Sequence, residues 1–517
     1  MSQNQPLAGS RPNILFVLAD DLSYRDLSCF GQIRFRTPTL DHLCETGVRF
    51  DEAYSGSPEC APARGSVMTG MHMGHCRIRL NRSARGQDHL EPEDTTIAEA
   101  LKTAGYATGM FGKWGIGLPG TPGTPEKKGF DYAFGFYDQR RAHTYYPHYL
   151  YENGRPVALP ENYGFDMDFS YRHTKDPEAR RDYDKNGRLR PRGVPDPDAA
   201  RNSEVLCCEK ALEFIDAHAG EPMFLYYCTQ LPHGPVIAPE LGELKDRPWD
   251  QRRQEWAAMI QLLDRHVAAL LQRLDRHGVL DNTLVVFASD NGYAHWGYMG
   301  RPRYSDDPVF RNKGPWRGGK FIALEGGVRV PMFVSWPGRV QQASTDALVA
   351  LYDLFPAFCE LAGVNPVPET DGSSFLPLLE GRSEAQERHE FLYWESGGHA
   401  RHAQALRLGP WFAWREHPDQ PVELYDTRID VASEHDVAED HPDVVGRVRD
   451  LFAQEHTDSE WYLNPGESDE TFREKSARAE AQGCIQQALK GNETYRGEPN
   501  KDHPAPRTVR RDPDIPD

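Results

Sequence analysis

Two uninterrupted apolar segments, each followed at once by oxygen-bearing side chains, limit the folds open to this chain more than any other feature. Residues 13–19 read NILFVLA and residues 283–289 read TLVVFAS. Apolar runs of this length are typical of parallel strands that are buried on both faces. In open α/β sheets ligands bind beyond the carboxyl ends of the strands, so the residues that follow these runs are candidates for a binding site. They are Asp20, Asp21, Asp290 and Asn291.

This set of three carboxylates and one amide oxygen favours a hard divalent cation. Ca2+ is the first expectation and Mg2+ the alternative, because the set has no soft ligand that would favour Zn2+. A helix cap or a solvated turn is the plainer interpretation of Asp20 and Asp21 taken alone. The presence of a second such strand end, with Asp290 and Asn291, favours a metal site over that interpretation.

The rest of the chain predicts an α/β fold with one large, mostly parallel sheet sandwiched by helices. Further strands are expected at residues 107–112, 223–229 and 330–336, and helices at 199–218 and 256–277. In the last of these segments apolar residues recur at intervals of three and four, which is the period of an amphipathic helix. A length of 517 residues suits one large domain with a smaller one appended.

A cysteine lies at the expected start of a helix, within SPECAPARGSVMTG at residues 57–70. Cys60 precedes a proline by two positions and Arg64 by four. The start of a helix is the positive end of its dipole, so a side chain at this place favours an anion. Taken alone, C-x-P-x-R is also compatible with a buried cysteine in a proline turn.

This segment resembles the signature of the type I sulfatases of the alkaline phosphatase superfamily, C-x-P-x-R followed by Thr-Gly. Further segments resemble other motifs of that family, in family order: DDLSYRDLSCFG, GKWGIG, QLPHGP and RGGKFIALEGGVRVP. In the first of them Ser23, Arg25 and Ser28 stand where glycines are commoner in the family. Agreement in order and spacing from residue 13 to residue 331 is too extensive for coincidence. By this resemblance the chain is identified as a member of the family, of the bacterial carbohydrate sulfatase type.

The resemblance implies a mechanism. A maturation enzyme would oxidise Cys60 to Cα-formylglycine, and one hydroxyl of its hydrate would attack the sulfur of a sulfate monoester while the four strand-end ligands hold Ca2+. Arg64, Lys113 and Lys320 would hold the sulfate oxygens or the hydrate. His233, in the family's P-H-x-P, would protonate the departing oxygen, a task that suits a histidine near neutral pH. The second hydroxyl would then expel inorganic sulfate.

One residue of the family pattern is missing. In G-K-W-H-x-G the histidine hydrogen-bonds the formylglycine hydrate, but this chain has Gly115 there. A different proton acceptor is therefore expected, with His143 and His72 as the candidates. His143 is also the candidate for substrate contact, because it lies in residues 129–160, whose aromatic, arginine and histidine side chains suit a sugar ring with hydroxyls and sulfate.

Three classes of function are open at this point. The leading hypothesis is a sulfatase that releases inorganic sulfate from a sulfated sugar or glycan, with an aryl sulfatase as its variant. The second is a phosphonate or phosphodiester hydrolase of the same superfamily. The third is a non-catalytic binder of sulfated glycans, which only the missing histidine suggests.

Three regions are expected. Residues 1–385 are predicted to form the catalytic sulfatase domain, and residues 386–465 a smaller subdomain with an antiparallel sheet and a helix. Residues 466–517 are polar and rich in charge and proline, and are predicted to be a tail that either packs along another subunit or moves freely. The charged, proline-bearing segment 173–198 is predicted to be a long excursion or flap.

Composition limits the classes of binding partner and the cellular location that are expected for this chain. The formal net charge is −19, which disfavours a general nucleic-acid binder. The nine cysteines are scattered without a C-x-x-C pair, so neither a zinc site nor a disulfide framework is expected. No signal peptide and no apolar run of membrane-spanning length is visible, so the chain is expected to be cytoplasmic as written, and periplasmic or secreted if a leader was removed. The expected partners are a sulfated carbohydrate or aryl sulfate and a formylglycine-generating enzyme, with a second copy of the chain as a further candidate.

Overall fold

A computed structural model describes most of the chain. The described residues are 6–139, 141–163, 181–191, 194, 196–294, 306–396 and 402–482. Part of the expected excursion at 173–198 and the end of the expected tail, from residue 483, lie outside them.

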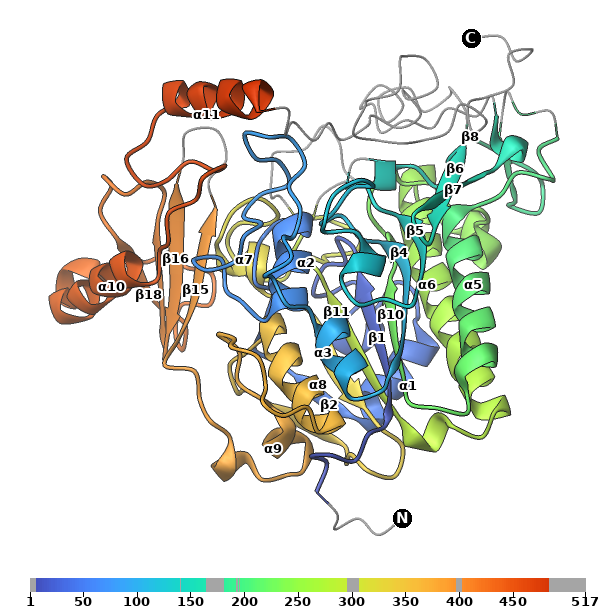
Figure 1. Cartoon of the computed structure of the whole chain (residues 1–517), viewed down its shortest axis with the longest axis horizontal. Coiled ribbons are helices and arrows are strands. Elements are labelled where there is room, and N and C mark those ends of the chain that lie inside the picture. Colours follow the sequence, from blue (N-terminus) through green and yellow to red (C-terminus); the bar gives the residue numbers. More distant parts are fainter. Residues whose placement is uncertain are drawn as a thin grey trace.

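The main sheet runs through the middle of the molecule (Figure 1) and has ten strands within the described residues, in the order β13-β2-β12-β11-β1-β10-β4-β5-β6-β7. The central strands β11, β1, β10, β4 and β5 are parallel to one another, and antiparallel pairs join β12 and β6 to them. The prediction of a mostly parallel sheet is therefore confirmed. The strands are β1 Asn13–Ala19, β2 Val48–Phe50, β4 Ala107–Lys113, β5 Tyr132–Phe136, β6 Tyr149–Glu152, β7 Arg155–Ala158, β10 Met223–Cys228, β11 Thr283–Ser289, β12 Met332–Ser335 and β13 Ala343–Thr345.

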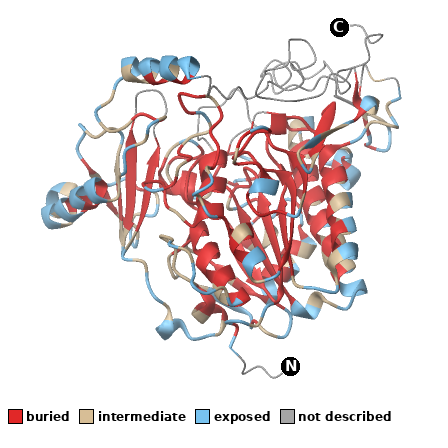
Figure 2. Ribbon diagram, in the orientation of Figure 1, coloured by how far each residue is buried: buried red, intermediate tan, exposed pale blue. Residues whose placement is uncertain are grey.

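Helices cover both faces of this sheet. Alternate side chains of β1 enter two different cores: Leu15 and Val17 pack with the helices of one face, and Ile14 and Phe16 with those of the other. In Figure 1 the green α5 and α6 stand on one side of the sheet and α2, α3 and α8 on the other. The central strands β1, β4, β10 and β11 between them are fully buried (Figure 2). The helices are α1 Pro38–Thr46, α2 Cys60–Thr69, α3 Ile97–Thr103, α5 Ser203–His218, α6 Gln251–Arg276, α7 Glu325–Val328, α8 Leu354–Ala362 and α9 Leu376–Leu379.

Helix α6 begins at Gln251, five residues before the start predicted from its apolar residues. The extra turn is stabilised by Asp250, whose side chain accepts a hydrogen bond from the backbone N–H of Arg253. The apolar period locates the buried face of a helix, whereas a polar cap decides where the helix starts. None of the described helices is both long and apolar enough to cross a membrane.

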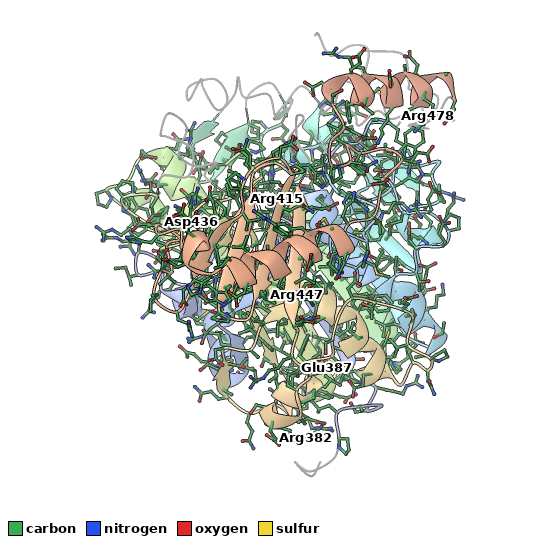
Figure 3. All side chains as sticks on the ribbon, turned by 90° about the vertical axis from the view of Figure 1, so that its left-hand side faces the viewer. Arg382, Glu387, Arg415, Asp436, Arg447 and Arg478 are labelled. Carbon is green, nitrogen blue, oxygen red and sulfur yellow. The ribbon has the colours of Figure 1, made fainter. Side chains whose placement is uncertain are left out.

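A second, antiparallel sheet of four strands lies beside the main domain, as predicted. Its strands are β15 Phe391–Ser396, β16 Ala403–Leu408, β17 Trp411–Arg415 and β18 Glu423–Asp426, and helix α10, Pro442–Gln454, packs on it through Val448, Leu451 and Phe452. Figure 3 looks onto this side, where α10 crosses the sheet and carries Arg447 on its outer surface. The boundaries at residues 385 and 465 stay predictions.

Part of the expected tail is helical. Helix α11, Asp469–Ala481, is capped by Ser468, whose hydroxyl accepts a hydrogen bond from the N–H of Thr471. Lys475 anchors the helix, since its ammonium donates to the carboxylate of Glu467 at 2.7 Å and to the carbonyl of Ser459 at 3.0 Å. The helix is mostly polar, so an apolar pattern could not have revealed it.

The shorter elements join these parts. Two small sheets pair β3 Ala53–Tyr54 with β14 Val349–Ala350, and β8 Arg181–Tyr183 with β9 Leu189–Pro191. The 3-10 turns are η1 Ser28–Phe30, η2 Pro125–Lys127, η3 Arg141–His143, η4 Pro160–Asn162, η5 Gly242–Asp246, η6 Leu280–Asn282, η8 Leu351–Asp353, η9 Ser383–Ala385 and η10 Ala438–Asp440.

A buried ion pair fastens the small sheet to the main domain. Nη1 of Arg79 lies 2.6 Å from Oε1 of Glu395, and both side chains are less than a tenth exposed. The other carboxylate oxygen of Glu395 accepts hydrogen bonds from Tyr393 and His456. Burial alone would raise the pKa of Glu395, but the neighbouring histidines and the charge of Arg79 outweigh it and hold that pKa well below its usual range.

Glu395→Ala is expected to lower the free energy of unfolding by about 3–5 kcal/mol, because it leaves Arg79 buried without its partner. The matched control is Glu390→Ala, directly before β15, since Glu390 pairs with Arg447 through side chains that are 63% and 43% exposed. An exposed pair of this kind contributes about 0–1 kcal/mol. Denaturant unfolding of both variants checks the prediction, and equal small losses would contradict it.

Candidate active site

The predicted strand-end residues meet at the carboxyl edge of the main sheet. Ala19 and Ser289 are paired in the parallel ladder of β1 and β11, so the residues after them lie side by side. The backbone N–H of Asp21 donates to Oδ1 of Asp290 at 3.1 Å, and Nδ2 of Asn291 donates to Oδ1 of Asp21 at 2.8 Å. Asp20 and these three residues are fully buried. The set is therefore a compact group of oxygen donors.

Cys60 is the first residue of α2 and faces this group. Its Sγ lies 3.4 Å from Oδ1 of Asp20, 3.6 Å from Oδ1 of Asn291 and 3.1 Å from Nζ of Lys320. The thiol is fully buried, and burial raises its pKa above the ordinary value. The side chain at residue 60 thus sits between a cation and carboxylates at the positive end of a helix.

Three buried cations surround the carboxylates. Nη2 of Arg64 lies 2.9 Å from Oδ2 of Asp290, Nζ of Lys113 lies 2.6 Å from Oδ2 of Asp20, and Nζ of Lys320 lies 2.6 Å from Oδ1 of Asp21. The formal charges of these three cations and the three acids balance. Lys113 ends β4 and Arg64 lies one turn into α2, so strand ends and a helix start supply the charges from different directions.

Neighbouring acids in this group differ in proton affinity. Burial and the nearby charge of Asp20 raise the pKa of Asp290 to about 7. At Asp20 burial acts in the same direction, but the charges of Lys113, His233 and Arg64 outweigh it and hold its pKa well below the usual range. Two buried carboxylates this close repel one another, and a shared cation would relieve that repulsion.

His233 and His143 lie together at one side of the group. Nε2 of His233 is 3.3 Å from Oδ2 of Asp21, and its Nδ1 is 2.6 Å from the carbonyl of Gly234, to which it donates. The two imidazole rings stack in parallel with their centroids 4.3 Å apart. Burial lowers the pKa of His233 to about 4 and lowers that of His143 too. The structure thus brings the predicted substrate-contact residue next to the predicted proton donor.

Comparison of the sequence with models of known protein families agrees with this arrangement. The model of the sulfatase family matches residues 12–364 of the chain. The chain belongs to the sulfatase family. A second model, of the C-terminal region of N-sulphoglucosamine sulphohydrolase, matches residues 316–444. The resemblance in the motifs is therefore confirmed, and this sulfatase is a sulfuric ester hydrolase.

Known relatives cover most of the sulfatase. An N-acetylgalactosamine-6-O-sulfatase of Bacteroides thetaiotaomicron is 29% identical, over 85% of this chain and 92% of its own. The bovine (Bos taurus) arylsulfatase A is 30% identical, over 78% of this chain and 75% of its own. Among solved structures, Ps i-CgsB in complex with k-i-k-neocarrahexaose superposes with a TM-score of 0.70 and 23% identity, over 92% of this chain and 100% of the other. That likeness shows a shared fold.

The donors of the sulfatase site fit a metal ion. Ligand atoms of Asp20, Asp21, Cys60 and His233 lie within 4.8 Å of one another, and all four residues are buried. Asp290 and Asn291 join them through the hydrogen bonds to Asp21 given above. A buried group dominated by carboxylate and amide oxygens is suited to a hard cation.

The candidate role of His72 does not fit the geometry. His72 follows the C-terminal end of α2, and a helix of ten residues, about 15 Å long, separates it from Cys60. Its Nδ1 accepts from the N–H of Gly74, so its Nε2 carries the proton that it shares with Glu455 at 3.1 Å. His72 is thus part of the contact between α2 and the C-terminal subdomain, too far from residue 60 to accept its proton directly.

Sequence reasoning missed the polar residues that hold Asp290 and the start of α2 in place. Ser55 donates to the backbone carbonyl of Asp290 at 2.5 Å, and Oδ1 of Asn81 accepts from the N–H of Ala61 at 2.9 Å. The backbone N–H of Asn81 in turn donates to Glu59, directly before the cysteine. These are single polar residues in loops, with no motif that would have marked them.

Proposed function

We propose that this sulfatase hydrolyses sulfate monoesters of a sulfated sugar or glycan at residue 60, after Cys60 has been converted to formylglycine. The position of Cys60 carries the proposal: its Sγ lies 3.1 Å from Nζ of Lys320 and 3.4 Å from a carboxylate oxygen of Asp20, at the start of α2. A formylglycine-generating enzyme is the partner that this conversion requires. Formylglycine supplies, as its hydrate, a hydroxyl that can attack sulfur.

Ca2+ is the cation proposed for the oxygen group, with Asp20, Asp21, Asp290 and Asn291 as its ligands. Three carboxylates and an amide oxygen suit Ca2+, which prefers oxygen ligands in flexible geometry. When bound, the ion would lower the pKa of a coordinated hydroxyl and offset negative charge on sulfate oxygens.

The chain's own cations would bind the ester. Each of these cations pairs with the oxygen group: Arg64 with Asp290 at 2.9 Å and Asp20 at 3.4 Å, Lys113 with Asp20 at 2.6 Å and Lys320 with Asp21 at 2.6 Å. A cation shared by those carboxylates would release part of this pairing, so that N–H groups could turn toward the sulfate oxygens. Fixed donors in a buried site stabilise developing charge more than water does.

The two stacked histidines would act on the sugar side of the ester, where the leaving oxygen departs. His233 is held by its contact with the carbonyl of Gly234 and presents Nε2 to the oxygen group. In its protonated form, which the negative charge of a bound sulfate ester would favour, His233 would pass a proton from Nε2 to the departing sugar oxygen. His143, whose ring lies parallel to it, would contact the sugar. The relative that acts on a sulfated sugar, the N-acetylgalactosamine-6-O-sulfatase, matches 85% of this chain and supports a sugar substrate.

A substrate panel tests this proposal. Protein co-produced with a formylglycine-generating enzyme would be offered 6-O-sulfated N-acetylgalactosamine, other sulfated monosaccharides, an aryl sulfate and a phosphonate monoester. We expect a sulfated sugar to have a kcat/KM about 100-fold above the aryl sulfate, the size of discrimination that several sugar contacts can provide. Preference for the aryl sulfate would overturn the sugar assignment. Preference for the phosphonate would overturn sulfate specificity.

A further inference from the structure

Gly115 stands where the family pattern has a histidine, and its backbone explains part of the change. Its φ is +79°, in the left-handed region that favours glycine, so any other residue would be strained there. A Cβ at this position would lie only 2.5 Å from Oε1 of Gln139 and 3.8 Å from Cδ of Arg64. The carboxamide of Gln139 therefore occupies the space that a side chain at residue 115 would enter.

The backbone of Gln139 is held in place by a buried glutamine, Gln87. Gln139 comes three residues after β5, whose last residue Phe136 pairs with Lys113 at the end of β4. Its backbone N–H donates to Oε1 of Gln87 at 2.7 Å, and Nε2 of Gln87 donates to the carbonyl of Tyr137 at 3.3 Å. The buried carboxamide of Gln87 thus fixes the loop at the carboxyl edge of the sheet, where the site lies.

The carboxamide of Gln139 is buried and unpaired. The residue is 4% exposed, and within the described part of the chain neither its Oε1 nor its Nε2 has a hydrogen-bond partner. Nε of Arg64, whose Cδ lies close to the same point, is also a buried donor without a partner among these residues. Buried polar groups left unpaired destabilise a protein, so they are typical of places where a ligand supplies the missing partner.

We propose that Gln139 takes the place of the missing histidine as a positioning residue that hydrogen-bonds an oxygen carried by residue 60. This inference rests on the proposed function. Arg64 lies one helical turn after Cys60 on α2, so the unpaired groups flank the side of α2 on which residue 60 stands. A carboxamide can donate or accept a hydrogen bond but does not titrate near neutral pH. Residue 139 therefore orients the nucleophile and takes no proton from it.

The first test is Gln139→Leu, which keeps the approximate shape and removes both polar atoms. In converted protein, assayed on the best substrate of the panel, we expect kcat to fall about 100-fold with KM little changed, the size of effect seen when one fixed hydrogen-bond donor is lost. In unconverted protein, where residue 60 is still cysteine, we expect an unfolding temperature equal to or above that of the parent, because no existing hydrogen bond is lost.

Gln87→Leu is the matched control. It makes the same chemical change at a carboxamide whose two ends are both paired, so it is expected to lower the unfolding temperature. A lower unfolding temperature for Gln139→Leu as well would show a structural role and overturn the inference. A change in kcat of less than threefold would also overturn it.

Gln139→His gives a second test that does not depend on loss of function. It places an imidazole near the space of the family histidine, and we expect at least tenfold more kcat than in Gln139→Leu, with a new pH-dependent limb near pH 6.5. A profile identical to that of Gln139→Leu would contradict the positioning role. Sulfate release by the parent protein is measured in parallel, so failure of the proposed function is seen there and is separate from failure of this inference.

Discussion

Cys60→Ala is expected to abolish turnover and leave the protein folded. Removal of a catalytic nucleophile typically costs on the order of 10⁴–10⁶ in kcat, and alanine can neither be oxidised to an aldehyde nor attack sulfur. The fold should survive, because the three ion pairs of the site do not involve the thiol. Initial rates of sulfate release from the best substrate give the first readout, and the unfolding temperature gives the second.

The matched control is Cys359→Ala. Cys359 is also fully buried in a helix, α8. It lies in the apolar core between the main sheet and the helices on one of its faces, away from the charged site. This variant should keep its turnover. We also expect Cys60→Ala to bind inorganic sulfate in a calorimetric titration, because Arg64, Lys113 and Lys320 remain. Residual turnover above about one hundredth of the parent rate would contradict the role of residue 60.

Removal of divalent cations is the second change with a large expected effect. Chelation should stop turnover and lower the unfolding temperature, and added Ca2+ should restore both. The physical reason is that Asp20, Asp21 and Asp290 are fully buried side by side, so that a cation bound among them stabilises only the folded protein. At a free Ca2+ concentration about 100 times the dissociation constant, this stabilisation is about 2.7 kcal/mol.

Two variants locate the effect. Asp21→Asn should lose the Ca2+-dependent rise in unfolding temperature, which is measured as the difference between chelated and Ca2+-loaded protein. Asp26→Asn should keep it, because Asp26 is an equally buried carboxylate nearby that instead bonds Trp256 and Asn312. Unchanged turnover and unfolding temperature after chelation would show that the oxygen group binds no metal needed for activity.

Physical patterning made part of this site predictable. A buried parallel strand places the next residue at the sheet edge, so NILFVLA-DD and TLVVFAS-DN were enough to bring Asp20 and Asp290 together. The start of α2 at Cys60 follows from the helix-forming residues after it. His233 was identified through the family's P-H-x-P, and His143 through the aromatic and basic side chains around it. Neither observation predicts that the two rings stack.

Other features depend on contacts that no local pattern encodes. Arg79 and Glu395 are buried partners more than 300 residues apart in the sequence. From the sequence alone, each would be predicted to be a charged residue on the surface. Gln139 is one polar residue in an irregular loop, and its relation to Gly115 is visible only when β4 and β5 are paired. His72 was named as a candidate only because it is a histidine, and the ten-residue helix α2 keeps it away from residue 60.

The most direct test of the account is the mass of the peptide that carries residue 60, from protein co-produced with a formylglycine-generating enzyme and assayed for sulfate release in the same preparation. The account predicts the mass of an aldehyde at that residue, with turnover proportional to the converted fraction across preparations. A preparation that releases sulfate at full rate while residue 60 is entirely unmodified cysteine would contradict it.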